Sequence, residues 1–173
     1  MAPYLIMTLR ATVAGTFLIS MVGKLRGRET LAGFVMTVRR IGRVPDRFAA
    51  PVAAGVIVTE AGIVVLLAVP GGQVAGFAMA AAVLAGFAVV LMAALRRGLA
   101  EPCRCFGKAE EPIGRRHVVR NGVLFVAAAA GAVFAPGVEG VPLEPAAVLL
   151  CLLAASAFVA FVVLLDDLLF LFR

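Results

Sequence analysis

Long apolar segments alternate with short polar ones along this chain. Each apolar segment approaches or exceeds the ~20 residues that an α-helix needs to cross a hydrocarbon layer of roughly 30 Å. The pattern predicts an all-α polytopic membrane helix bundle that forms a single domain over residues 1–173. The five predicted transmembrane helices cover residues 4–22, 52–69, 74–95, 118–134 and 146–171.

The connection between the first two predicted spans has a different pattern. Apolar residues recur there at helical spacing on one side and charged residues take the other side, which is typical of an amphipathic helix on the inner membrane surface. Pro45 predicts where this helix ends. The helix is either a plain surface anchor or a docking platform for a partner. Its apolar side carries Leu31, Phe34, Val35, Val38 and Ile41, and its charged side carries Arg28, Glu29, Arg39, Arg40 and Arg43.

Composition supports the membrane class, and the basic residues predict an orientation. Hydrophobic residues make up 63% of the chain, and the mean hydropathy is +1.08. Of the 16 Lys and Arg residues, all but Arg10 and Arg173 lie in or beside the connections after the first and third spans. Because basic residues near span ends stay in the cytoplasm, we expect the amino terminus outside and the carboxyl terminus inside the bacterial cytoplasmic membrane.

The same topology accounts for the net charge of +6, so the charge does not indicate nucleic-acid binding. The first apolar segment lacks the basic start and the small-residue cleavage site of a signal peptide. We therefore expect it to stay in the mature protein as the first membrane helix. The expected surroundings are a lipid bilayer on all sides of the bundle.

Two charges fall inside the predicted spans. Arg10 lies in the first span and Glu60 in the second, and counting helical rise from the inner boundary places both at a similar depth. An unpaired charge near the bilayer centre costs about 2.5–3.5 kcal/mol on insertion scales. We therefore predict an Arg10–Glu60 ion pair, which either fixes helix packing or forms a proton or substrate site.

A polar segment between the third and fourth spans carries two closely spaced thiols, in Cys103-Arg104-Cys105-Phe106-Gly107. A disulfide between them would close a small ring, and strained or exposed disulfides are the labile, exchanging ones. Nearby Arg96, Arg97 and Lys108 would favour the reactive thiolate. The spacing indicates thiol–disulfide exchange, with Cys103 and Cys105 as the candidate catalytic residues. Two alternatives stay open, a metal site completed by His117 and a loop without chemistry.

Further candidate residues support this segment or the bundle. His117 opens the fourth span and is either an interfacial side chain or a general base for a cysteine. Arg120 follows it, and Asn121 is positioned to hydrogen-bond across helices. Cys151 is most simply a small buried apolar residue. Small residues that would let helices approach closely are Gly55, Gly62, Gly76, Ala80, Gly86, Ala154 and Ala155.

The order of these features resembles the MauE family of methylamine-utilisation accessory proteins, within a wider group of DoxX-like membrane proteins. The resemblance begins at Gly23-Lys24-Leu25 and continues through the amphipathic stretch to Pro45 and the glutamate at position 60. Its most specific part is Pro102-Cys103-Arg104-Cys105-Phe106-Gly107 followed by Arg116-His117-Val118-Val119-Arg120-Asn121. Arg104 stands where the family pattern more commonly has a glycine.

This resemblance implies a component of a thiol–disulfide oxidoreductase system. It would act beside a thioredoxin-like partner on the disulfides of an exported client protein. Such chemistry belongs outside the cytoplasm, whereas the charge pattern places the thiols inside. Three explanations of this conflict stay open: the loop folds back into the bundle, electrons cross the membrane, or the charge-based orientation is wrong. The alternatives are a DoxX-like small-solute or quinone-linked protein centred on Arg10 and Glu60, with quinone as a candidate cofactor, and a non-catalytic assembly factor.

Overall fold

The computed structural model describes residues 1–99, 114–138 and 144–171, and the side chains at 115, 116 and 162–171 fall outside this description. The described residues form six α-helices and one short 3₁₀ helix, which confirms the all-α prediction. In chain order these elements are α1 (Ala2–Leu25), α2 (Arg28–Ile41), α3 (Asp46–Ala68), α4 (Gln73–Arg96), α5 (Arg115–Phe134), η1 (Ala135–Val138) and α6 (Pro145–Leu171).

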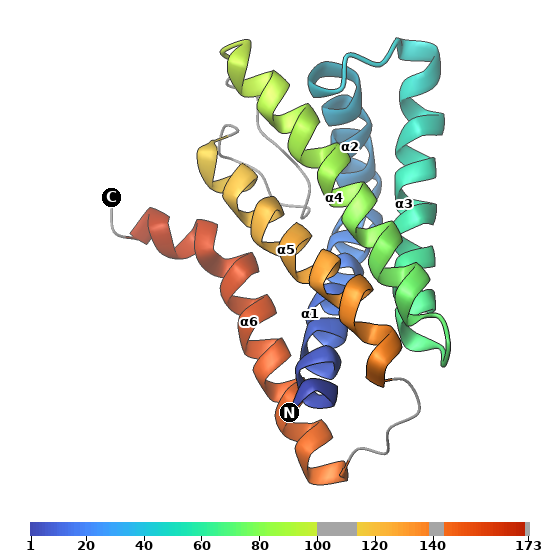
Figure 1. Ribbon diagram of the computed structural model, residues 1–173. Helices are drawn as coiled ribbons and strands as arrows, with labels where there is room; N and C mark the ends of the chain where they lie inside the picture. The colour runs from blue at the N-terminus through green and yellow to red at the C-terminus, as the bar shows by residue number, and fades with distance from the viewer. Residues whose placement is uncertain (100–113, 139–143, 172–173) are drawn as a thin grey trace.

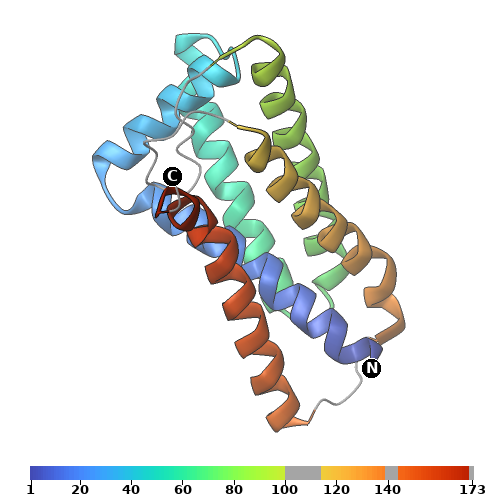
Figure 2. The same cartoon turned by 90° about the vertical axis from the view of Figure 1, so that its left-hand side faces the viewer.

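The long helices alternate in direction along the bundle, and α1 occupies its centre (Figure 1). Helix α1 contacts every other α-helix, whereas α6 packs mainly on α1 and α5 packs mainly on α4. Figure 2 shows α6 lying along one side of α1 from the same end of the bundle. We call the end towards which α1 and α4 run, and at which α3 and α5 begin, the Lys24 end, and the opposite end the Tyr4 end.

Four helices are long and apolar enough to cross a membrane, which confirms a multi-pass membrane protein. They are Ala2–Leu25, Asp46–Ala68, Gln73–Arg96 and His117–Val138, of 22 to 24 residues each. The fifth predicted span corresponds to α6, in which the stretch Pro145–Phe161 forms a shorter apolar helix among the described side chains. Each span therefore begins and ends close to where the hydropathy pattern places it.

Helix α2 forms where the amphipathic pattern predicts it, and its apolar side faces the bundle. Phe34 and Ile41 are buried against α1, α3 and α4, while Arg39 and Arg40 on the other side are exposed. The helix ends at Ile41 with Gly42 as its cap, Arg43 then takes a positive φ of 55°, and Pro45 caps the start of α3. That α2 lies on the inner membrane surface stays a prediction.

Two glycines allow the closest approaches between helices. A Cβ built on Gly76 of α4 would lie 2.9 Å from the side chain of Leu67 on α3, which is closer than real Cβ contacts come. A Cβ on Gly131 of α5 would meet the ring of Phe77 on α4, and Phe77 is completely buried. These contacts belong to the main core, which contains Val13, Phe17, Ile63, Leu67, Phe77, Ala80, Leu84, Leu124 and Ala128.

The predicted role of small residues in helix packing is therefore confirmed in part. Gly62, Gly76, Ala80 and Ala155 lie at close or fully buried positions. The prediction is wrong for Ala154, which is exposed, and for Gly55 and Gly86, where an added Cβ would meet no atom within 4 Å. The last two glycines are exposed and border open space.

Replacement of Gly131 by Ala is expected to destabilise the bundle by about 1–3 kcal/mol, because the new methyl group has no room beside Phe77. The matched control is Gly122→Ala on the same helix, where a Cβ meets nothing within 4 Å and no loss is expected. Thermal unfolding of both variants in the same detergent measures the difference. Equal melting temperatures would contradict the close α4–α5 contact.

Candidate functional site

A lysine, a glutamate and a serine form a buried polar cluster at the Lys24 end. The Lys24 Nζ lies 2.5 Å from Glu60 Oε1 and donates a second hydrogen bond to Ser20 Oγ at 2.7 Å. The Ser20 hydroxyl in turn donates to Glu60 Oε1 over 3.1 Å. Both charged side chains are only 1% exposed, so the ion pair is enclosed by the protein.

The local structure explains why Lys24 is buried although it lies in the last turn of α1. Side chains on a helix lean towards its amino terminus, so Lys24 reaches back over Ser20, four residues earlier, into the bundle. Helix α2 then covers it, with the ring of Phe34 4.8 Å from the ammonium group. Thr30 Oγ1 also lies 3.2 Å from the Lys24 carbonyl oxygen, which joins the start of α2 to the end of α1.

The predicted Arg10–Glu60 ion pair is wrong. The guanidinium of Arg10 donates instead to backbone carbonyls at the last turn of α3, through Nε to Leu67 O and through Nη2 to Ala68 O at 2.8 Å. Those carbonyls have no partner within the helix, and a cation there also interacts favourably with the helix dipole. Arg10 therefore caps α3 near the Tyr4 end.

The error has a definite cause. Depth counting treated Lys24 as the inner membrane boundary, whereas its side chain extends into the bundle and becomes the partner of Glu60. Sequence reasoning thus missed Lys24 and Ser20 as site residues. The available signal was their spacing of four, which puts a hydroxyl and an ammonium on one face of the first span.

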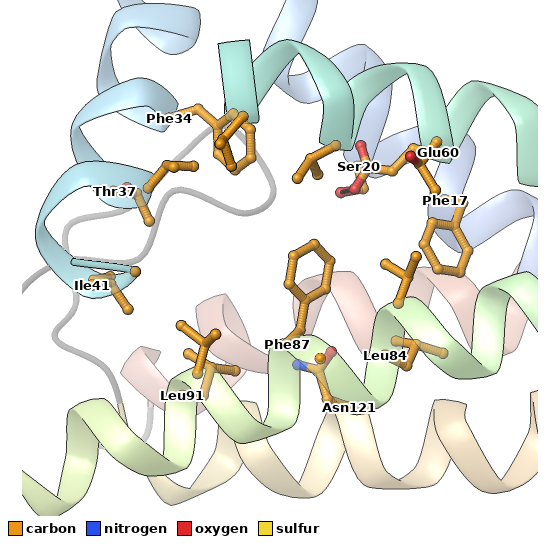
Figure 3. Close-up of a pocket in the computed structure, with 18 of the residues that line it drawn as sticks. Phe17, Ser20, Phe34, Thr37, Ile41, Glu60, Leu84, Phe87, Leu91 and Asn121 are labelled. Carbon is orange, nitrogen blue, oxygen red and sulfur yellow. Dashed lines mark hydrogen bonds between the residues drawn. The ribbon is translucent and has the colours of Figure 1, made fainter. Parts of the chain in front are cut away.

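The ion pair borders a cavity of about 550 Å³ formed by helices α1 to α5. In Figure 3, Glu60 and Ser20 lie on one wall, Phe34, Thr37 and Ile41 of α2 on a second, and Leu84, Phe87 and Leu91 of α4 on a third. Asn121 of α5 also borders the space. Most of the wall is therefore apolar, and the carboxylate is a polar exception within it.

One oxygen of Glu60 is left without a partner. Oε1 receives both Lys24 and Ser20, whereas Oε2 is buried and accepts no hydrogen bond from any residue that the structure describes. Buried polar atoms without a partner are uncommon in folded proteins. The site can therefore accept one further hydrogen bond at this atom.

The supporting residues of the fourth span lie at the start of α5. His117 is buried and its Nδ1 accepts a hydrogen bond from the Gly114 backbone N–H at 3.3 Å, which holds the first turn. The side-chain amide of Asn121 donates to His117 O at 2.8 Å, so this bond lies within α5 and not across helices as predicted. Arg120 and Asn121 both line the cavity.

The three cysteines differ in what the structure says of them. Cys103 and Cys105 lie outside the described residues. Cys151 is buried on α6 as predicted, with its Sγ 3.5 Å from the Tyr4 carbonyl oxygen, and therefore lies at the Tyr4 end. The described chain that leads to Cys103 leaves from the Lys24 end, where Arg97 Nη2 donates to Ile41 O over 2.9 Å and ties the end of α4 to α2.

Fold and site together define a multi-pass membrane helix bundle with a buried ion pair beside an internal apolar cavity. Comparison with known families assigns it further. Residues 2–134 match the family described as methylamine utilisation protein MauE, and since this is more than half of the chain, the protein belongs to the MauE family. It is thus a MauE-family membrane protein involved in methylamine utilisation. No curated protein and no solved structure matches the chain.

Removal of either member of the Lys24–Glu60 pair is expected to lower the free energy of unfolding by about 3–5 kcal/mol, because the remaining charge stays buried without its partner. Lys24→Met and Glu60→Gln make these changes with little loss of volume. The double variant is expected to be more stable than either single variant. Unfolding of all four proteins in mixed micelles gives the coupling energy.

The exposed pair Arg39–Asp46, at 3.0 Å, serves as the control for this cycle. Its side chains are 45% and 77% exposed, so Arg39→Gln is expected to change stability by about 1 kcal/mol or less. Additive effects of Lys24→Met and Glu60→Gln would show that the two groups do not stabilise one another.

Proposed function

We propose that this MauE-family membrane protein takes part in thiol–disulfide exchange through Cys103 and Cys105. It would act beside a thioredoxin-like partner during the maturation of exported proteins. The observation that carries the proposal is the family match, because residues 2–134 include both cysteines together with the buried pair and the start of α5. The match ends before α6 and Cys151.

The chemistry needs only an exchange of bonds. A thiolate of the partner attacks the Cys103–Cys105 disulfide and forms a mixed disulfide, and a second partner thiolate then releases both cysteines as thiols. The partner gains the disulfide that this protein loses. Basic residues on both sides of the segment favour thiolates during each step.

The described helix ends on either side of the thiol segment are well anchored. Helix α4 is tied to α2 by the Arg97–Ile41 bond, and the first turn of α5 is held by the bond from Gly114 to His117. The thiol segment therefore joins two helix ends that are both fixed to the membrane bundle, which supports the proposal.

Cys151 does not lie at the end of the bundle from which the described chain leads to Cys103. It lies beside Tyr4, at the end of the bundle opposite the one where α4 finishes. A relay of thiols across the membrane would therefore need a large movement or a further carrier. Exchange is accordingly assigned to Cys103 and Cys105 alone.

The alternative of a small-solute or quinone-linked protein was centred on Arg10 and Glu60. Arg10 caps α3 and does not contact Glu60, so that pairing no longer supports it. Glu60 remains of interest because it borders the cavity with Lys24 as its partner. The non-catalytic assembly factor differs from our proposal in a single respect, since it does not need the thiols.

Cys103→Ser and Cys105→Ser, each alone, are expected to reduce maturation of the client's disulfides by at least about tenfold, since each removes one of two sulfur atoms that the exchange requires. Cys151→Ser is the matched control and is expected to retain full activity. The measurement is the fraction of oxidised client in cells, with the membrane level of each variant determined in parallel. Full maturation with both cysteines replaced would favour the assembly factor.

The charge pattern predicts that Cys103 and Cys105 face the cytoplasm. A membrane-impermeant maleimide added to intact cells carrying Cys151→Ser should therefore leave both thiols unlabelled until the membrane is opened. Reduction before labelling separates protection by the membrane from protection by a disulfide. Labelling in intact cells would contradict this orientation and show that the pair lies on the side where exported proteins mature.

A further inference from the structure

The cavity formed by helices α1 to α5 is partly open to the outside of the bundle, since Val52, Gly55 and Gly86 in its lining are exposed. Its volume of about 550 Å³ falls in the range of small-molecule sites. Gly55 on α3 and Gly86 on α4 both line it, and a Cβ added at either would meet no atom within 4 Å. Larger side chains would fit at both positions, so the space is not required by helix packing.

One buried side-chain acceptor without a partner lies in the described part of the cavity wall, and it shows what chemistry the space can recognise. Glu60 Oε2 is buried, lies on a side chain that lines the cavity, and has no hydrogen-bond partner among the described residues. A buried acceptor that lacks a hydrogen bond costs about 1–3 kcal/mol. A ligand with one O–H or N–H group would satisfy this oxygen.

The charges around the cavity limit the ligand to a neutral donor. Glu60 is already neutralised by Lys24, and Arg120 also lines the cavity. An ammonium or other cationic donor would find the Glu60 carboxylate already paired and would be repelled by the neighbouring Lys24 ammonium group. A neutral hydroxyl meets no such repulsion, and Lys24 and Ser20 occupy the other oxygen of the carboxylate.

The apolar walls limit the rest of the molecule. Phe17, Phe34, Leu84, Phe87 and Leu91 are among the apolar side chains that line the cavity. A sugar or other polyhydroxylated solute would leave most of its polar groups unpaired against these side chains. A molecule that partitions from the bilayer and carries one hydroxyl at the end of an apolar body fits the wall and the carboxylate together.

We infer that this cavity is a binding site for a lipid-soluble hydroxyl compound that donates its hydrogen bond to Glu60 Oε2. Two sources share this chemistry, an aromatic hydroxyl of the phenol or quinol class and a membrane lipid with a free aliphatic hydroxyl. The inference does not depend on thiol exchange, because it rests on the described residues of α1 to α5.

The test compares probes that differ only in the donor. Delipidated protein in detergent is titrated with 4-octylphenol and with 4-octylanisole, in which a methyl group replaces the hydroxyl hydrogen. The phenol is expected to bind about tenfold more tightly, as one hydrogen bond to a charged group warrants. Equal affinities overturn the inference.

Titration with 1-decanol separates the two sources of the hydroxyl group. Binding as tight as that of 4-octylphenol assigns the site to an aliphatic hydroxyl, and weaker binding assigns it to an aromatic hydroxyl.

Space-filling variants locate the binding without removing a buried charge. Gly86→Leu and Gly55→Leu are expected to weaken 4-octylphenol binding at least about tenfold while the melting temperature is kept, because the added side chain occupies the cavity. Gly122→Leu is the control, since a Cβ there also meets nothing within 4 Å but the residue lies outside the cavity lining. Unchanged binding by both Gly86→Leu and Gly55→Leu would place the probe elsewhere and overturn the assignment.

Discussion

The ion pair between Lys24 and Glu60 is the interaction on which the Lys24 end of the bundle depends. Two charges at 1% exposure have lost their hydration, and their attraction offsets this loss only if the geometry is close and the remaining groups are hydrogen-bonded. The 2.5 Å contact and the two bonds of Ser20 meet that condition for the ammonium group and for Glu60 Oε1, whereas Oε2 has no partner among the described residues. The pair joins the end of α1 to the middle of α3.

Helix α2 encloses this pair, a role that the amphipathic pattern did not predict. Phe34 covers the ammonium group of Lys24, and Thr30 contacts the carbonyl of the same residue, so the amphipathic helix closes over the end of α1. Arg97 then binds the far end of α2 through Ile41 O. Helix α2 is thereby tied to α1 at its start and to α4 at its end, and it forms one wall of the cavity.

Helix α5 borders the cavity and also begins where the described chain resumes after the cysteine segment. Arg120 and Asn121 line the cavity, while His117 and Gly114 form the turn at which the described chain resumes after residue 113. The family match spans both features. A hydroxyl compound bound beside Glu60 would therefore lie against the helix that follows the two cysteines in the sequence.

Hydropathy alone determined the membrane class, the all-α fold, the span positions and the amphipathic helix, because these depend on local periodicity and on segment length. The residues that carry the family resemblance also stand in the sequence and need no coordinates. The partner of Glu60, in contrast, could not be identified from the sequence alone. Arg10 and Lys24 are both cations on α1, and the choice between them depends on side-chain reach and on the cover that α2 supplies, neither of which residue counting contains.

The cavity was likewise decided only by tertiary structure. Gly62, Gly76, Gly55 and Gly86 look alike in sequence, yet the first two lie against neighbouring side chains and the last two border open space. Which glycine faces which surface follows from the relative rotation and crossing of whole helices, a property of the packed bundle and of no single segment. The sequence therefore specified the helices and their chemistry, and packing specified which charges meet and where space remains.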